Sequence, residues 1–170
     1  TRPVPAFFMF NATFSIWHIP ALYNLSVISH EVHIGEHLLF IATAMIMWWP
    51  LTSNVPELPR LSYPLAIIYL FLLSIAQIIV FAPITFSREP LYEWYVDAPR
   101  IFGLSPLTDQ QLGGIIMKIG GAAIFLPLLI VLFFRWHSRE EDENRIDGVL
   151  FEERHSYHME KKGQKITYEQ

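Results

Sequence analysis

Residues 63–84 read YPLAIIYLFLLSIAQIIVFAPI and carry no Lys, Arg, Asp or Glu, and the uncharged region extends from residue 61 to residue 87. A helix of about 20 apolar residues spans the hydrocarbon core of a bilayer. Backbone groups inside lipid must be hydrogen-bonded within the segment, which a helix achieves. This run therefore predicts a transmembrane helix.

Three further segments have the same character, and they cover residues 4–23, 33–51 and 110–134. The whole chain of 170 residues is 52% hydrophobic and only 16% charged, against about 25% charged in soluble domains. We therefore predict an all-α fold, a polytopic membrane helix bundle with four transmembrane helices in residues 1–135. A water-soluble globule is excluded for this part of the chain.

Residues 136–170 differ in composition, with nine acidic and six basic residues and few apolar positions. This pattern predicts a charged tail that is helical near its start and then loose. Basic residues flanking the predicted spans set their orientation. Arg2, Arg60, Arg135 and Arg139 place both termini and the tail in the cytoplasm, with the loops before residues 33 and 110 outside.

Composition also excludes several kinds of site and partner. The chain has no cysteine, so disulfides, thiolate zinc sites and cysteine nucleophiles are ruled out. A net charge of −4 and an isoelectric point of about 5.9 argue against nucleic-acid binding. The expected surroundings are a lipid bilayer and other membrane proteins.

Histidines are concentrated at residues 29–37, SHEVHIGEH. On a helix, His30, His33 and His37 fall within about 60° of one another. His18, in the preceding span, is expected to add a fourth imidazole from a facing helix. Ionisable groups in a membrane segment indicate function by default, so we predict a metal site, although a single interfacial histidine is commonly a hydrogen-bonded structural residue.

The choice of metal depends on residues 113–121, where glycine pairs and Met117 share one face. Imidazole binds zinc, copper, iron or nickel, and a thioether on the same site favours cuprous copper. Alternatively, Met117 fills the gap beside the glycines. Glu36 is expected to point away from the histidines and to pair with Lys118, directly or through water, because both charges lie within the spans.

Residues 33–37 also match the H-x-x-E-H pattern of some zinc metalloproteases. Such enzymes need a further acidic ligand and a water-filled cleft, and the spans that follow contain no acidic residue. The chain shows no other pairing of nucleophile and base. We therefore predict that it is not an enzyme.

A set of short motifs occurs in a fixed order along residues 2–137. They are Trp17-His18-Ile-Pro20-Ala-Leu-Tyr23, His33-x-x-Glu36-His37, Trp48-Trp49-Pro50, Pro90-Leu-Tyr92 and Gly103-Leu-Ser-Pro-Leu-Thr-Asp109-Gln110-Gln111-Leu-Gly113-Gly114. Together they resemble the C-terminal part of the CtaG family, membrane assembly factors for haem–copper cytochrome c oxidases.

The resemblance implies a non-enzymatic protein of the bacterial plasma membrane that helps insert copper into the oxidase on the outer side. The positions that match are His18, His33, Glu36 and His37, with Asp109 and Gln110 at the start of the last span. Family members usually have further spans and histidines in an N-terminal half. The chain begins at Thr1, so either its N-terminus is processed or it is the C-terminal part of a longer protein.

Three functions remain open at this point. The first is a copper-handling assembly factor that uses His18, His30, His33, His37 and Met117 and transfers the ion to an oxidase subunit. The second is a stoichiometric accessory subunit of a respiratory complex, in which the histidines are structural. The third is haem ligation by His18 and a histidine of residues 33–51.

Overall fold

The computed structural model describes residues 2–100 and 103–167, with side chains described as far as residue 158. All of its secondary structure in these residues is helical, which confirms the all-α prediction. The elements are α1 (Pro3–Trp17), α2 (Pro20–Ile28), α3 (His30–Thr52), α4 (Tyr63–Ala76), α5 (Ile78–Phe86), α6 (Glu93–Asp97) and α7 (Pro106–Thr167).

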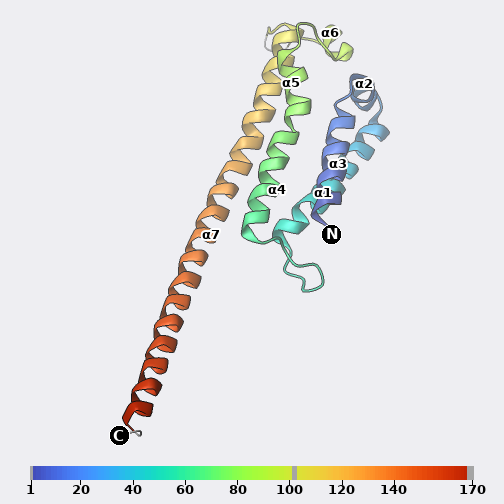
Figure 1. Ribbon diagram of the computed structural model, residues 1–170. Helices are drawn as coiled ribbons and strands as arrows, with labels where there is room; N and C mark the ends of the chain where they lie inside the picture. Colours follow the sequence, from blue (N-terminus) through green and yellow to red (C-terminus); the bar gives the residue numbers. More distant parts are fainter. Residues whose placement is uncertain (1, 101–102, 168–170) are drawn as a thin grey trace.

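The helices form two packed groups (Figure 1). Helix α1 packs along α3, and the consecutive helices α4 and α5 pack along α7. The short helices α2 and α6 contact each other at one end of the bundle, beside the first turns of α3 and α7. The N-terminus and the loop of residues 53–62 lie at the opposite end, beyond which α7 continues alone (Figure 1).

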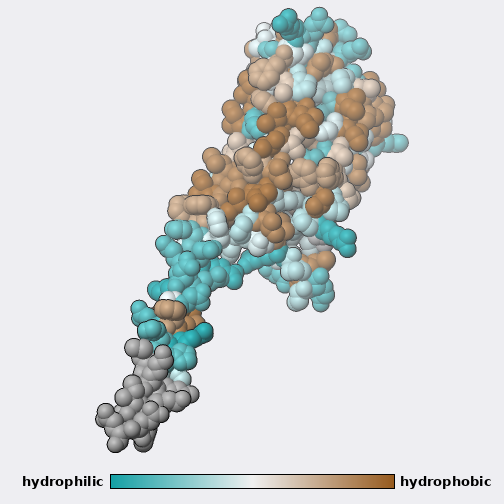
Figure 2. Space-filling model, viewed as in Figure 1, coloured by the Kyte–Doolittle hydropathy of each residue, from teal (hydrophilic) through white to brown (hydrophobic). Residues whose placement is uncertain are grey.

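Three helical segments are long and apolar enough to cross a membrane: α3, the pair α4–α5 and the first part of α7. Their outward side chains are apolar as well, for example Ile79, which is 70% exposed. Figure 2 shows an apolar band across the visible face of the bundle, with hydrophilic residues above and below it. A continuous exposed apolar band matches a lipid environment, and the chain is a membrane protein.

The fourth predicted span, residues 4–23, is not confirmed. Helix α1 has 15 residues, a length of about 22 Å at 1.5 Å per residue, which is shorter than the hydrocarbon core. The chain leaves the helix after Trp17, and Ile19 has extended backbone angles before Pro20 begins α2. A residue that precedes proline is disfavoured in the α conformation, so Pro20 divides the segment into two helices.

A second interruption lies at Gln77, between α4 and α5. Near this break the Lys118 ammonium donates to the Ser74 carbonyl at 3.2 Å. The predicted direct ion pair of Lys118 with Glu36 is therefore wrong, since the ion pairs of the described residues do not include it; pairing through water stays a prediction. The bond to Ser74 gives the half-buried ammonium a partner where lipid offers no water.

Two groups of buried side chains lie between the helices: the first has members on α3, α4 and α7, and the second has members on α5 and at Tyr92, with Met117 of α7 packed against it. We call them the Leu73 cluster (Met47, Tyr69, Leu70, Leu73 and Phe125) and the Ile84 cluster (Val80, Ile84 and Tyr92). Beside the Ile84 cluster α7 approaches α5 closely, because a Cβ on Gly114 would contact Thr85 Oγ1 and come within 3.1 Å of Ile84 Cγ2. Small residues allow such close packing of membrane helices.

The charged tail is more regular than its composition indicates. Helix α7 runs for 62 residues to Thr167 without a break, and residues 168–170 lie outside the described part of the chain. Oppositely charged side chains pair at helical spacing, as in Arg139–Glu143 at 2.8 Å and Arg145–Asp142 at 2.9 Å. Such pairs stabilise a solvated helix, so the loose tail that the composition predicts is not observed.

Candidate metal centre

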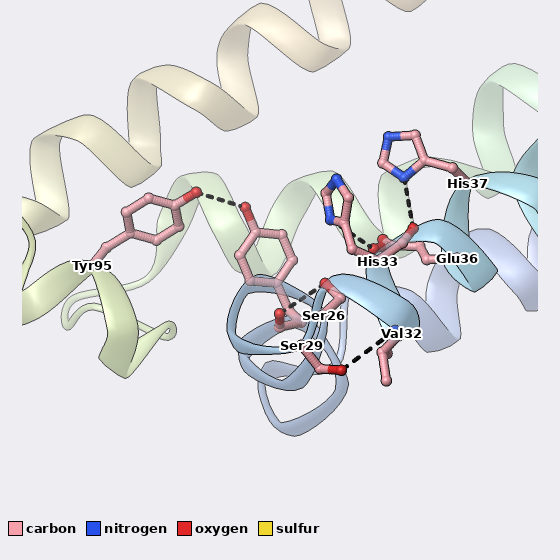
Figure 3. Close-up of polar contacts among 8 residues, drawn as sticks. Ser26, Ser29, Val32, His33, Glu36, His37 and Tyr95 are labelled. Carbon is pink, nitrogen blue, oxygen red and sulfur yellow. Dashed lines mark hydrogen bonds and ion pairs between the residues drawn. The ribbon is translucent and has the colours of Figure 1, made fainter.

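The first turn of α3 positions the candidate ligands. Ser29 is the N-cap residue, and its Oγ accepts a long hydrogen bond of 3.5 Å from the Val32 amide (Figure 3). Serine is a favoured N-cap residue because it satisfies an amide at the helix start that has no partner within the helix. The helix therefore begins at His30 and carries the histidines of residues 30–37 at the α2–α6 end of the bundle.

His33, Glu36 and His37 form a compact group (Figure 3). Each offers one ligand atom, and these atoms all lie within 4.8 Å of one another. Nδ1 of His33 is 3.9 Å from Oε2 of Glu36, and the two imidazole centroids are 4.3 Å apart. The prediction that Glu36 points away is wrong, because residues at offsets of 3 and 4 from His33 lie next to each other on its side of the helix.

The hydrogen bond of His37 determines which of its two ring nitrogens is available to a metal. Its Nδ1 lies 3.0 Å from the His33 carbonyl oxygen. A carbonyl only accepts, so the neutral ring donates from Nδ1–H and leaves Nε2 as a lone-pair donor to a metal. Metal-binding histidines commonly donate their other ring nitrogen to a carbonyl in this way.

His33, Glu36 and His37, which we call the triad, lie in a cavity of about 560 Å³ between α2, α3 and α6. The side chain of Glu36 is only 11% exposed, whereas that of His33 is 50% exposed. The carboxylate thus lies below the two rings, which border open space. We call this the histidine cavity; its lining residues are Tyr23, Ser26, Val27, Ile28, His30, His33, Glu36, His37, Trp94 and Tyr95.

The other predicted ligands are placed differently. His30 lines the histidine cavity but is not part of the triad. His18 and Met117 do not line it and belong to a second cavity of about 320 Å³. We call this the methionine cavity; it is lined by His18, Tyr23, Ile84, Pro90, Tyr92, Tyr95, Pro106, Asp109, Gln110, Gly113, Gly114 and Met117.

Two tyrosines border both cavities, and neither belongs to the site predicted from the sequence, although Tyr23 ends one of the quoted motifs. Tyr23 from α2 and Tyr95 from α6 line both cavities, and their hydroxyls are joined by a hydrogen bond of 3.0 Å. Figure 3 shows Tyr95 reaching towards α2 on the side of the triad away from His37. Only the packing of two short helices that are distant in sequence brings this pair together.

A third tyrosine, Tyr92, is hydrogen-bonded next to the same two cavities. The Tyr92 hydroxyl donates to the His18 carbonyl at 3.1 Å. Burial raises the pKa of Tyr92 to about 12. Burial also raises the pKa of Tyr23, and the hydrogen bond with Tyr95 raises it further. Both phenols are therefore neutral at physiological pH and act as hydrogen-bonding groups, not as anionic ligands.

Helix α7 contributes residues of its first three turns to the methionine cavity. Ser105 caps the helix, its Oγ accepting from the Thr108 amide at 3.1 Å. Gln110 then links two neighbouring segments, because its Nε2 donates to the Ile84 carbonyl at 3.0 Å and its Oε1 accepts from the Leu91 amide at 2.6 Å. Gln110 is thus a structural residue of this end of the bundle, and Asp109 lies beside it at the cavity.

Comparison with known proteins gives one finding. The sequence model of a family described as cytochrome c oxidase caa3 assembly factor matches residues 1–139. No curated protein and no solved structure matches the chain.

Proposed function

Because the chain belongs to the cytochrome c oxidase caa3 assembly factor family, we propose that it serves oxidase assembly by holding copper at His33, Glu36 and His37 and passing it to an oxidase subunit. Two imidazoles and a carboxylate bind divalent transition metals, and among these copper(II) binds such ligands most strongly. The family assignment favours a non-catalytic role.

The observation that carries this proposal is the clustering of three ligand atoms within 4.8 Å beside an open cavity. Three protein ligands leave at least one coordination position free. A free position lets a ligand from another protein bind the ion before the first protein releases it. The site is therefore suited to transfer by ligand exchange, which an assembly factor needs and a permanent metal centre does not.

The distribution of positive charge supports an outward-facing site. The histidine cavity lies at the α2–α6 end, while Arg2 and Arg60 belong to the N-terminus and the loop at the opposite end (Figure 1). Arg135 and Arg139 follow the apolar part of α7 on that same side. Positive residues favour the cytoplasm, so we propose a bacterial plasma-membrane protein with both described ends cytoplasmic and the cavity facing outwards.

The geometry does not support haem ligation by His18 and a histidine of α3. His18 lines the methionine cavity, and the histidines of α3 line the histidine cavity on the other side of Tyr23 and Tyr95. Two axial ligands must face one iron across the porphyrin plane. The remaining alternative, a stoichiometric accessory subunit, predicts co-purification with the oxidase in fixed ratio and no dependence on these histidines.

The test is the copper content of the detergent-purified full chain, measured by elemental analysis after loading with copper(II) and removal of free ion. The wild-type protein is expected to retain copper, and the double variant His33→Ala/His37→Ala is expected to lose the copper held by the triad. His137→Ala is the matched control, because His137 also pairs with a glutamate on a helix surface, at 3.4 Å from Glu141, but lies outside both cavities. Equal copper in the double variant and the control would overturn the proposal.

A gentler variant separates loss of a ligand from loss of structure. His37→Asn keeps a side-chain NH that can donate to the His33 carbonyl and removes the nitrogen equivalent to Nε2. It is expected to weaken copper binding at least about tenfold while circular dichroism shows unchanged helix content.

A further inference from the structure

The methionine cavity contains two potential metal ligands that the triad does not use. His18 follows the C-terminus of α1, and Met117 lies on α7, so the two residues approach the cavity from different helices. Asp109 lines the same space from the first turn of α7. The cavity is thus bordered by a nitrogen ligand from the end of α1 and by an oxygen and a sulfur ligand from α7.

His18 is held with one ring nitrogen already used. Nδ1 lies 2.6 Å from the Phe14 carbonyl oxygen, and the Phe14 ring lies 4.4 Å from the imidazole, centroid to centroid. As in His37, the carbonyl requires Nδ1–H to donate, so Nε2 of the neutral ring carries the lone pair. Among the described residues Nε2 has no hydrogen-bond partner.

Met117 lines the cavity and also packs against the Ile84 cluster. Gly113 lines the cavity one turn away, and a Cβ there would meet nothing within 4 Å, whereas a Cβ on Gly114 would contact Thr85. The amide of Gln110 cannot serve as a ligand without losing its two hydrogen bonds, at 3.0 and 2.6 Å. Asp109 has no ion pair among the described residues. The groups left available are therefore His18 Nε2, the Met117 thioether and the Asp109 carboxylate.

We propose that the methionine cavity is a second, separate copper site that takes copper(I) through His18 and Met117, with Asp109 balancing its charge. A thioether selects soft copper(I), whereas the two imidazoles and carboxylate of the triad suit copper(II). The hydrogen-bonded pair Tyr23–Tyr95 borders both cavities and keeps the two ligand sets apart. This inference rests on the proposed copper-handling function and adds that one chain holds two ions independently.

The experiment uses the full chain in detergent under anaerobic conditions, titrated with copper(I) against a colorimetric copper(I) chelator. X-ray absorption at the copper edge then reports whether sulfur is bound to the ion. Met117→Leu removes the thioether at nearly constant volume. His18→Asn keeps a donor for the Phe14 carbonyl and removes Nε2.

The wild-type protein is expected to show a copper–sulfur distance that Met117→Leu abolishes. Met117→Leu and His18→Asn are each expected to weaken copper(I) binding at least about tenfold and to leave copper(II) at the triad unchanged. Met45→Leu is the control, because Met45 is 62% exposed on α3 and lines neither cavity. His33→Ala/His37→Ala is expected to keep the copper–sulfur signal.

Two results would overturn the inference. One is a wild-type spectrum without sulfur, and the other is a sulfur signal that survives in Met117→Leu. Neither result affects the copper(II) measurement on the triad. Conversely, the proposed function is contradicted if His33→Ala/His37→Ala keeps all of its copper(II). The copper–sulfur signal still tests the second site in that case.

Discussion

The Leu73 cluster and the Ile84 cluster both join the α4–α5 pair to α7, but they pack very differently. Leu70 and Leu73 are 1% and 0% exposed, and the Leu73 cluster borders neither cavity. The Ile84 cluster has Tyr92 among its members and lies against the methionine cavity. In one half of the bundle large aliphatic and aromatic side chains fill the space between the helices. The other half leaves a cavity that both polar and apolar residues line.

This difference separates stability from function within the same helices. Membrane helices associate mainly through close packing, because lipid is as apolar as leucine. The Leu73 cluster provides that packing. At the α2–α6 end the backbone is interrupted before Pro20. There α7 packs closely on α5 at Gly114, but a Cβ on Gly113, which lines the methionine cavity, would meet nothing within 4 Å.

The largest expected loss of stability comes from removing a buried side chain of the Leu73 cluster. Leu73→Ala removes a fully buried side chain, and the cavity left behind costs about 2–4 kcal/mol of unfolding free energy. Its neighbour Leu72 is 47% exposed on the outer surface, where detergent or lipid fills the space, so Leu72→Ala is the control. Reversible unfolding in detergent measures both, and equal losses would contradict the comparison.

A smaller effect is expected where α7 approaches α5. Gly114→Ala places a methyl group against Thr85 and Ile84, and such overpacking costs about 1–3 kcal/mol. Gly113→Ala meets open space and gains helix propensity of up to about 1 kcal/mol, so it is expected to be neutral or stabilising. The same unfolding assay compares them; a neutral Gly114→Ala would mean that this half is loosely packed throughout.

The smallest effect is expected at the boundary between the cavities. Tyr95→Phe removes the hydrogen bond to the Tyr23 hydroxyl, with a cost of about 0.5–1.5 kcal/mol. Tyr157→Phe is the control, because Tyr157 is 61% exposed in the tail. A loss in Tyr95→Phe as large as that of Leu73→Ala would show that the tyrosine pair is part of the stabilising core.

Much of the helical architecture could be predicted from the sequence. Residues 33–51, 63–84 and 110–134 each fall within a helical segment long enough to span a membrane. A predominantly apolar run has few other solutions in lipid, where its backbone groups must be hydrogen-bonded within the segment. Pro20 also indicates that residues 4–23 are divided into two helices, whereas their hydrophobicity alone predicts a single span. The regular helix of the tail depends on pairs such as Arg139–Glu143, which overall composition does not reveal.

The candidate site was only partly predictable. Spacing along one helix is enough to bring His33 and His37 together, and the same spacing should have included Glu36. The separation of His18 from the α3 histidines depends on how α2 and α6 pack, and no local pattern encodes that contact. The predicted binding of copper by His18, His30, His33, His37 and Met117 stays a prediction until the metal measurements are made.

The uninterrupted helix α7 determines how far the tail extends from the membrane. At 1.5 Å per residue, residues 136–167 extend about 48 Å beyond the apolar band, while the hydrocarbon core of a bilayer is about 30 Å thick. A protein bound at the far end of this helix would stand farther from the bilayer than the bilayer's apolar core is thick.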